Sequence, residues 1–163
     1  MGIKVKILIL LSIACLWWGL LAKAERTVVV DKPRLELYVM DDGKKIFSAP
    51  VCVGKRHGNK KRKGDMKTPE GTFPISMIQK SSSWKHDFGD GHGQRAGAYG
   101  PWFIRLKVPG TNHIGIHGTC FPLSIGTRDS EGCVRMYNDD LEDLKKLVKV
   151  GMKVTILPDK KKD

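Results

Sequence analysis

From residue 26 onward, short runs of β-branched and aromatic residues alternate with turn-forming residues, and this rhythm constrains the fold more than any other feature. The first three runs are TVVVD, RLELYVM and KKIFSAPVCVG, with Asp41-Asp42-Gly43 as a hairpin turn between the second and the third. In the second run apolar residues at positions 35, 37 and 39 alternate with Glu36 and Tyr38, as in a half-buried strand. The pattern predicts a meander of antiparallel strands.

The rest of the chain continues this pattern with one exception. Residues 68–75, 101–108, 113–118 and 153–157 are typical of further short strands. Only the segment NDDLEDLKKLVKV has a helical period, with Asn138 expected as its N-cap and Gly151 as its end. Together these elements predict a mainly β fold, a β-sandwich or β-barrel with one C-terminal α-helix packed on it.

Two segments are expected to be loops. Residues 81–100 are rich in Gly and Ser and predict a long functional loop or lid, in which Trp84, Phe88 and Tyr99 either cover a substrate groove or anchor the loop to the core. His86 and His92 are expected to be solvated there. Residues 55–67 contain seven Lys or Arg and predict a solvated basic loop that can touch an anionic substrate.

The first 24 residues predict a signal peptide. Lys4 and Lys6 precede an apolar run, and Ala22-Lys23-Ala24 matches a signal peptidase site. A retained membrane anchor is the alternative, because the run approaches the length that spans a bilayer. We therefore expect an exported protein of the periplasm or cell wall, with one domain over residues 25–159, a basic tail over residues 160–163, and membrane contact only through the signal segment.

The charge of the exported chain predicts anionic partners. Removing three lysines with residues 1–24 leaves 26 of the 29 basic residues against 17 acidic ones, a net charge of +9. Such a charge attracts anionic cell wall, anionic lipid or nucleic acid. Residues 55–67 lack the interleaved aromatics that are typical of nucleic-acid binding, so we expect no nucleic-acid partner. A chain of this length is expected to act as a monomer.

Three cysteines remain after residue 24, and an odd number leaves at least one free thiol in an oxidising compartment. Cys133 follows Gly132, and a bent backbone there could aim N–H groups at one point as an oxyanion hole, while those groups and Arg135 lower the pKa of the thiol. His117, at the end of a predicted strand, is the candidate base, with the Gly118 carbonyl as its orienting partner.

Three alternatives stay open for these residues. His113, His117, Cys120 and Cys133 could form a zinc site, since mixed His and Cys sets bind zinc. Cys52 and Cys120 could form a disulfide, or all three cysteines could stay reduced. Cys133 could also be a buried sulfur with no chemical role.

The segments GIHGT and SIGTRDSEGCVRMYNDDL resemble the L,D-transpeptidase (YkuD-like) catalytic domain family, as do TPEGTFPI and YGPWFIRL upstream, so the resemblance covers about residues 26–157. It implies a β-rich fold and an acyl transfer on a peptidoglycan tetrapeptide stem that releases the terminal D-alanine, without metal or organic cofactor. The acceptor is an amine on a second stem or on a wall-attached protein. L,D-carboxypeptidase or amidase activity, and a non-catalytic wall-binding module, remain alternatives.

The resemblance also implies roles for single residues. Cys133 is the nucleophile, His117 the general base and acid, and Gly118 the residue whose carbonyl fixes the imidazole tautomer. The N–H groups of Gly132 and Cys133 form the oxyanion hole. The residues expected to line the substrate site are Ser130, Arg135, Thr119 and Tyr99.

One position departs from the family pattern. Glu131 stands where the family has a His between Ser and Gly. Because the family's base is the upstream His, matched by His117, we expect activity with an altered substrate preference. A carboxylate so near Cys133 also predicts a somewhat raised thiol pKa and slower acylation.

Overall fold

The structure, a computed structural model, describes residues 25–159, so the predicted signal peptide and basic tail lie outside the described residues. The strands are β1 (Thr27–Asp31), β2 (Glu36–Asp41), β3 (Lys44–Pro50), β4 (Val53–Gly54), β5 (Gly71–Lys80), β6 (Lys85–Asp87), β7 (Gln94–Ala96), β8 (Trp102–Leu106), β9 (Gly115–His117), β10 (Arg128–Ser130), β11 (Val134–Arg135) and β12 (Lys153–Ile156). They are joined by the 3₁₀ turn η1 (Pro122–Ser124) and the α-helix α2 (Asn138–Leu147).

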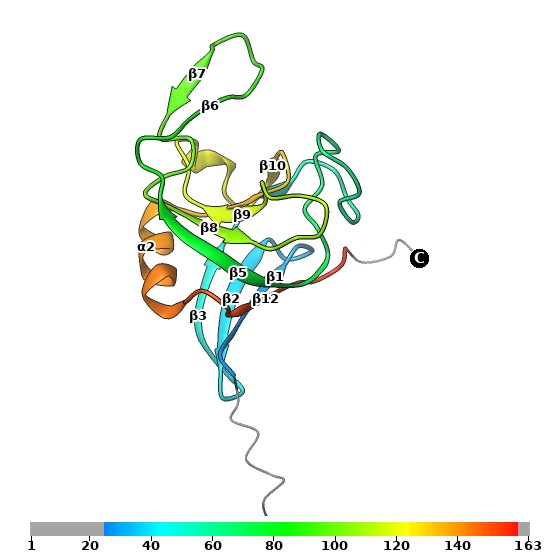
Figure 1. Cartoon of the computed structure of the whole chain (residues 1–163), viewed down its shortest axis with the longest axis vertical. Helices are drawn as coiled ribbons and strands as arrows, with labels where there is room; N and C mark the ends of the chain where they lie inside the picture. Colours follow the sequence, from blue (N-terminus) through cyan, green and yellow to red (C-terminus); the bar gives the residue numbers. More distant parts are fainter. Residues whose placement is uncertain (1–24, 160–163) are drawn as a thin grey trace, which may run out of the picture.

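Eight of these strands form one curled sheet in the order β11-β9-β8-β5-β12-β1-β2-β3. β4 pairs with β10, and β6 pairs with β7, as two further small sheets. Figure 1 shows α2 beside the curled sheet, where Leu141 and Leu144 are fully buried in the common core. The predicted mainly β fold with one C-terminal helix is therefore confirmed for residues 25–159, and no helix in that range is long and apolar enough to cross a membrane.

The first hairpin follows the sequence pattern closely. β2 pairs antiparallel with β3, and Asp42 and Gly43 both have positive φ, at 48° and 73°, as a tight two-residue turn requires. Leu37 and Val39 are fully buried, whereas Tyr38 is only half-buried. The two-residue period therefore faces the core as predicted at these two positions, whereas Leu35 precedes the strand with a φ of 54° and is half-buried.

Three boundaries differ from the prediction. Residues 81–100 are not a plain loop but contain the β6–β7 hairpin, which projects beyond the main sheet in Figure 1. α2 ends at Leu147 rather than near Gly151, because Val148 adopts an extended conformation. Tyr137, not Asn138, occupies the N-cap position, and no side chain caps the helix. The Asn138 side chain is used elsewhere, at the candidate site.

A buried lysine, Lys32, joins several segments of the fold. The Nζ atom of Lys32 lies 2.7 Å from Glu70 Oε1 and 3.2 Å from Asp159 Oδ2. It also donates to the carbonyls of Gly58 and Thr68. Lys32 is only 1% exposed, so this cluster closes the base of the 55–67 loop against the end of the described chain.

Candidate active site

Three strands at one end of the sheet bring the candidate residues to one face. β8 pairs antiparallel with β9, and the register sets Phe103 opposite His117. β11 pairs parallel with β9, and the register sets Arg135 beside His117. Residues paired across a sheet point to the same face, as do residues two apart in one strand. Phe103, His117, Arg135 and, just before β11, Cys133 therefore share a face.

His117 is held in one orientation. Its ring stacks on Phe103, with centroids 5.4 Å apart and planes 11° apart, and meets the edge of Tyr99 at 4.9 Å. Its Nδ1 lies 2.6 Å from the carbonyl oxygen of Gly118. Because a carbonyl only accepts, Nδ1 carries the proton in this contact and Nε2 has a free lone pair. The imidazole is thus the tautomer that can take up a proton at Nε2.

The pKa of His117 is lowered to about 3, mainly because burial disfavours the imidazolium, and the cationic Arg135 lowers it further. The hydrogen bond with Gly118 opposes this shift. Only 4% of His117 is exposed. The imidazole is therefore neutral across the physiological pH range.

A side-chain amide holds the backbone that follows His117. Asn138 Oδ1 accepts from the N–H of Thr119 at 2.9 Å, and its Nδ2 donates to the Thr119 carbonyl. A Cβ on Gly118 would lie 2.1 Å from that Oδ1, so only glycine fits here. Thr119 is itself buried and lies outside the residues that line the cavity, so it supports the site's backbone rather than the predicted substrate contact.

Cys133 ends a tight turn organised by Ser130. The hydroxyl of Ser130 donates to the Cys133 carbonyl at 2.6 Å and accepts the N–H of Gly132 at 3.1 Å. The N–H of Gly132 is thus already paired within the turn, whereas the sequence predicted it as an oxyanion donor. The N–H of Cys133 is the other donor of that prediction.

The thiol of Cys133 is half-buried and donates to the His113 carbonyl at 3.2 Å. Its pKa is raised, mainly by burial and slightly by Glu131, although Arg135 and Lys60 act in the opposite direction. The lowered pKa that the turn and Arg135 predicted is therefore wrong, whereas the raising effect of Glu131 has the predicted sign. In the resting site the thiol and the imidazole are both neutral at pH 7.

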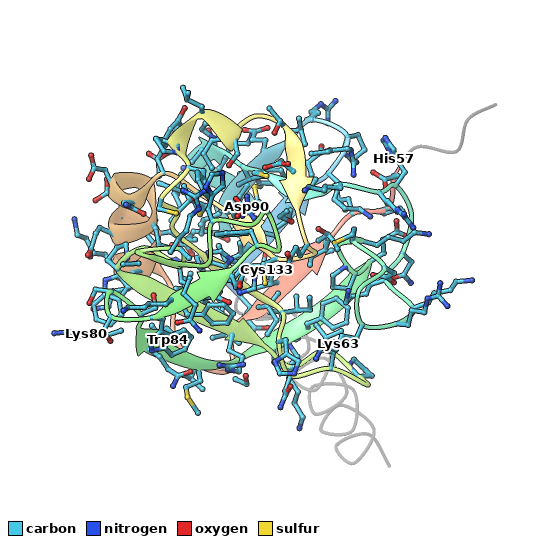
Figure 2. All side chains as sticks on the ribbon, turned by 90° about the horizontal axis from the view of Figure 1, so that it is seen from above. His57, Lys63, Lys80, Trp84, Asp90 and Cys133 are labelled. Atoms are coloured by element: carbon cyan, nitrogen blue, oxygen red, sulfur yellow. The ribbon has the colours of Figure 1, made fainter. Side chains whose placement is uncertain are left out.

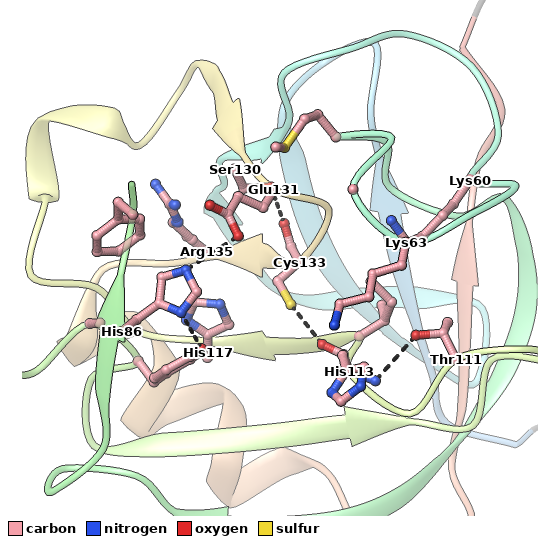
Figure 3. A pocket seen from close by; sticks show the side chains of 16 residues that line it. Lys60, Lys63, His86, Thr111, His113, His117, Ser130, Glu131, Cys133 and Arg135 are labelled. Carbon is pink, nitrogen blue, oxygen red and sulfur yellow. Dashed lines mark hydrogen bonds and ion pairs between the residues drawn. The ribbon is translucent and has the colours of Figure 1, made fainter. Parts of the chain in front are cut away.

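Cys133 and His117 line one cavity of about 320 Å³, which also includes Tyr99, Ser130 and Arg135. Figure 2 places Cys133 near the centre of the face that carries this cavity. Figure 3 shows His86, His117 and Arg135 on one side of the thiol and Lys60, Lys63 and Thr111 on the other. Four of the expected site residues besides Cys133 therefore meet in one hollow.

Arg135 is a buried cation, and one of its guanidinium nitrogens has no hydrogen-bond acceptor among the described residues. It is 4% exposed, and within residues 25–159 its Nη1 has no hydrogen-bond partner. That atom lies 3.5 Å from Asp129 Oδ2, an ion pair without hydrogen-bond geometry. The guanidinium also lies over the Phe88 ring at 5.4 Å. A planar guanidinium with unused donors in a cavity is suited to a carboxylate ligand.

The β6–β7 hairpin forms one wall of the cavity through a residue that the sequence placed in solvent. His86 Nε2 lies 3.2 Å from Glu131 Oε2, and its Nδ1 lies 3.1 Å from the hydroxyl of Tyr99. Phe88 packs edge-on against Phe121. The expectation that His86 is solvated is therefore wrong, and only the aromatic content of its segment hinted at a covering role.

A second, more open cavity of about 570 Å³ adjoins the first. The two cavities share Phe88, Glu131 and Arg135. Glu131 therefore lies at the boundary between the two cavities and contacts His86 of the β6–β7 hairpin.

The zinc and disulfide alternatives do not match the arrangement of side chains. Among the residues that the structure describes, no group of three or more His, Cys, Asp or Glu side chains is placed to hold a metal ion. Cys52, Cys120 and Cys133 are all free thiols in the described range. Cys133 supplies the thiol that lines the cavity, and His117 is the candidate base among the three imidazoles that line it, those of His86, His113 and His117.

The fold and the site together define a β-sheet protein with a cysteine and a histidine in one cavity. The family model of the L,D-transpeptidase catalytic domain (YkuD) matches residues 25–156, and the chain belongs to this family. YkuD of Bacillus subtilis, named as an L,D-transpeptidase, is 43% identical over 107 residues, which cover 66% of this chain and 51% of that protein. YqjB of the same organism is 32% identical over 134 residues, covering 81% and 71%.

Solved structures show the same fold. Pgp2 of Campylobacter jejuni, described as a helical cell shape determining protein, is 26% identical with a TM-score of 0.58, covering 85% of this chain and 49% of that chain. An L,D-transpeptidase of Enterococcus faecium is 19% identical with a TM-score of 0.60, covering 82% and 50%. The chain spans 59% of YkuD of Bacillus licheniformis and 51% of its Bacillus subtilis counterpart.

Proposed function

We propose that the chain is a peptidoglycan L,D-transpeptidase, a cysteine acyltransferase that cross-links or remodels the cell wall. The observation that carries the proposal is the pairing of a neutral His117, with Nε2 free to accept a proton, and the Cys133 thiol in one cavity. Family membership supports the reaction type. The relatives named as L,D-transpeptidases support the same chemistry.

In the first half-reaction the Cys133 thiol turns from the His113 carbonyl and gives its proton to Nε2 of His117. Side-chain rotation of this kind takes picoseconds to nanoseconds in partly exposed residues. The sulfur attacks the carbonyl carbon of the third residue of a tetrapeptide stem. The C–N bond to the terminal D-alanine then breaks, and His117 returns the proton to the leaving amine. A thioester on Cys133 remains.

In the second half-reaction an acceptor amine attacks the thioester carbonyl. His117 takes a proton from the amine, the C–S bond breaks, and the thiol is restored. The N–H of Cys133 donates to the oxyanion in both half-reactions. The N–H of Gly132 can add a second hydrogen bond to the oxyanion when it is shared between that oxygen and the Ser130 hydroxyl. Two adjoining cavities that share Phe88, Glu131 and Arg135 give two stems separate approaches, which favours transfer to an amine over transfer to water.

Arg135 is proposed to bind a carboxylate of the donor stem. Its unpartnered Nη1 and its burial make a charged ligand the natural partner, since a buried guanidinium without hydrogen bonds is costly. Tyr99 lines the same cavity beside His117. Ser130 contributes by holding the Cys133 turn.

The decisive experiment uses the purified chain and a disaccharide tetrapeptide. We expect an intact-mass adduct on Cys133 that corresponds to loss of D-alanine, followed by a cross-linked dimer. Cys133→Ser should give neither, while the matched control Cys120→Ser, whose thiol lies outside the cavity lining, should behave as the parent. Free tripeptide without dimer would identify a carboxypeptidase. No adduct and no product from the folded parent would favour the wall-binding module.

A carbapenem offers a second test, because it acylates the same nucleophile in the proposed chemistry. We expect a covalent adduct on the parent and none on Cys133→Ser, by intact mass.

We also propose that residues 1–24 direct export to the periplasm or cell wall, that residues 25–159 are the catalytic domain, and that residues 160–163 are a basic tail. The net charge of +9 after cleavage supports a partner among anionic wall polymers. N-terminal sequencing of the exported protein should begin near Glu25. A mature protein that retains Met1 would contradict this proposal.

A further inference from the structure

Lys60 is a buried ammonium at the turn that carries Cys133, although its sequence surroundings predict a solvated loop. Its side chain is 8% exposed, and it lines the same cavity as Cys133 and His117. A Cβ built on Gly132, which has φ +135°, would lie 3.3 Å from the Lys60 Nζ atom. The ammonium is therefore in contact range of the turn, with no side chain at residue 132 between them.

An aspartate holds this ammonium in place. The carboxylate of Asp65 accepts four hydrogen bonds, from Lys60 Nζ at 2.8 Å and from the backbone N–H groups of Lys61, Arg62 and Lys67 at 2.7, 3.0 and 3.1 Å. Burial opposes ionisation of Asp65, but these donors hold its pKa well below the ordinary value. The 55–67 loop is thus folded around one anion, and the position of Lys60 is fixed by that fold.

The loop and the cysteine turn are packed directly on each other. The Lys67 carbonyl lies 2.7 Å from the Cβ position of Gly132, closer than any real side chain allows. Charged residues from both segments act on the Cys133 thiol. Arg135, next to the turn, and Lys60, from the loop, favour the thiolate, whereas Glu131, in the turn, disfavours it. Lys63, Tyr99, His86 and His117 line the same cavity. Lys60 therefore offsets the carboxylate of Glu131 from the opposite wall.

We propose that Lys60 is a second cation, besides Arg135, that stabilises negative charge at the Gly132–Cys133 turn, on the thiolate sulfur and on the carbonyl oxygen that becomes an oxyanion during acylation. Asp65 is the positioning residue that fixes it. The part concerning the oxyanion rests on the proposed acyl transfer. The part concerning the sulfur does not, because a thiolate can be measured without any substrate.

The test is the pH dependence of Cys133 alkylation by iodoacetamide, followed by peptide mass mapping so that Cys52 and Cys120 are counted separately. Lys60→Met should raise the apparent pKa of Cys133 by about 0.5 to 1 pH unit, which slows alkylation at pH 7 roughly three- to tenfold. Lys60→Gln removes the charge but keeps a donor for Asp65, and should give the same shift. If Lys60→Met does not fold, the Lys60→Gln variant alone tests whether the Lys60 charge lowers the pKa of Cys133.

Lys61→Met is the matched control, because Lys61 is an exposed lysine of the same loop and contributes only its backbone N–H to Asp65. It should leave the alkylation profile unchanged. Equal profiles for folded Lys60→Gln and Lys61→Met would overturn the assignment. A shifted profile in a protein that forms no adduct with the tetrapeptide would keep the assignment and reject the proposed acyl transfer, so the two failures are distinguishable.

Discussion

Two buried cations of this protein, Lys32 and Arg135, have opposite surroundings. Lys32 is 1% exposed, and its Nζ contacts two carboxylates and two carbonyl oxygens. Arg135 is 4% exposed, but its Nη1 has no hydrogen-bond partner among the described residues, and its nearest carboxylate, on Asp129, is half exposed. The two side chains are almost equally buried, so they differ mainly in how many oxygen atoms surround the charged group.

The difference separates a structural charge from a charge that we propose to be functional. Removing a charge from water is costly unless polar partners replace the lost solvent. Around Lys32 the fold supplies these partners, so the charge joins the 55–67 loop to the end of the described chain. Around Arg135 the fold leaves Nη1 without an acceptor beside a cavity, which agrees with the proposal that a substrate carboxylate supplies one. Four substitutions or conditions test this distinction.

The largest effect is expected for Lys32→Met. Loss of the ammonium leaves Glu70 and Asp159 without their main cation, and should lower the free energy of unfolding by about 3 to 5 kcal/mol. Activity per folded molecule should stay close to that of the parent, because Lys32 does not line the cavity. Chemical denaturation and a burst of D-alanine release measure the two quantities. An unchanged unfolding free energy would contradict the structural role.

Arg135→Met should show the reverse pattern. The loss of a charge-assisted pair with a substrate carboxylate should lower kcat/KM about a hundredfold, which corresponds to roughly 2.7 kcal/mol. Stability should be unchanged or slightly higher, because an incompletely paired buried charge is removed. Steady-state kinetics on the tetrapeptide and thermal unfolding measure this pair of effects. A large loss of stability with normal kinetics would show that Arg135, like Lys32, has a structural role and does not bind the substrate.

Acid should weaken the Lys32 cluster selectively. Burial acts to raise the pKa of Asp159, but the Gly58 N–H, Lys32 and Arg128 hold it below the ordinary value. A lowered folded-state pKa means that the stabilisation is complete above about pH 4, the unfolded value, and is lost as the pH falls through the folded value. The stability gap between the parent and Lys32→Met should therefore narrow by about 1 kcal/mol in acid. If the difference in unfolding free energy between the parent and Lys32→Met did not change with pH, Asp159 would not contribute to the stability of the Lys32 cluster.

The smallest effect is expected for Glu131→Gln, next to Arg135. The hydrogen-bonded contact with His86 is partly exposed, at 29% and 43% of the two side chains, so its loss should cost less than about 1 kcal/mol. Removal of the carboxylate that opposes the thiolate should speed Cys133 alkylation about twofold. Asp87→Asn is the control, because Asp87 is an exposed acidic residue next to His86 in the β6–β7 hairpin. Slower alkylation in Glu131→Gln would show that Glu131 helps the thiol.

Local sequence patterns predicted most of the fold. The alternation around Leu37 and Val39, the Asp42-Gly43 turn and the helical run at Leu141 and Leu144 depend on interactions between near neighbours in the chain. The same patterns located Cys133 and His117 as the candidate pair. They failed for the β6–β7 hairpin, whose strands are three residues long and contain polar residues.

Contacts distant in the sequence decided the remaining features of the site. Asn138 was predicted as a helix cap, yet it binds the backbone of Thr119, 19 residues away. His86 was placed in solvent, yet it contacts Glu131, 45 residues away. Lys60 was one of seven basic residues in a loop, and only its contacts with Asp65 and with the Gly132 turn make it different from Lys61. No period or spacing in the sequence encodes these partners.

The sequence by itself determined that this chain forms short strands with one helix packed on them, and it singled out a thiol and an imidazole as the candidate reactive groups, because strand period, turn residues and side-chain chemistry are local properties. Only the tertiary structure decided which charges are satisfied. Whether a buried Lys or Arg meets oxygens or an open cavity depends on strands and loops brought together by the register of the sheet. Those surroundings determine whether each charge is already paired within the fold or is left beside a cavity.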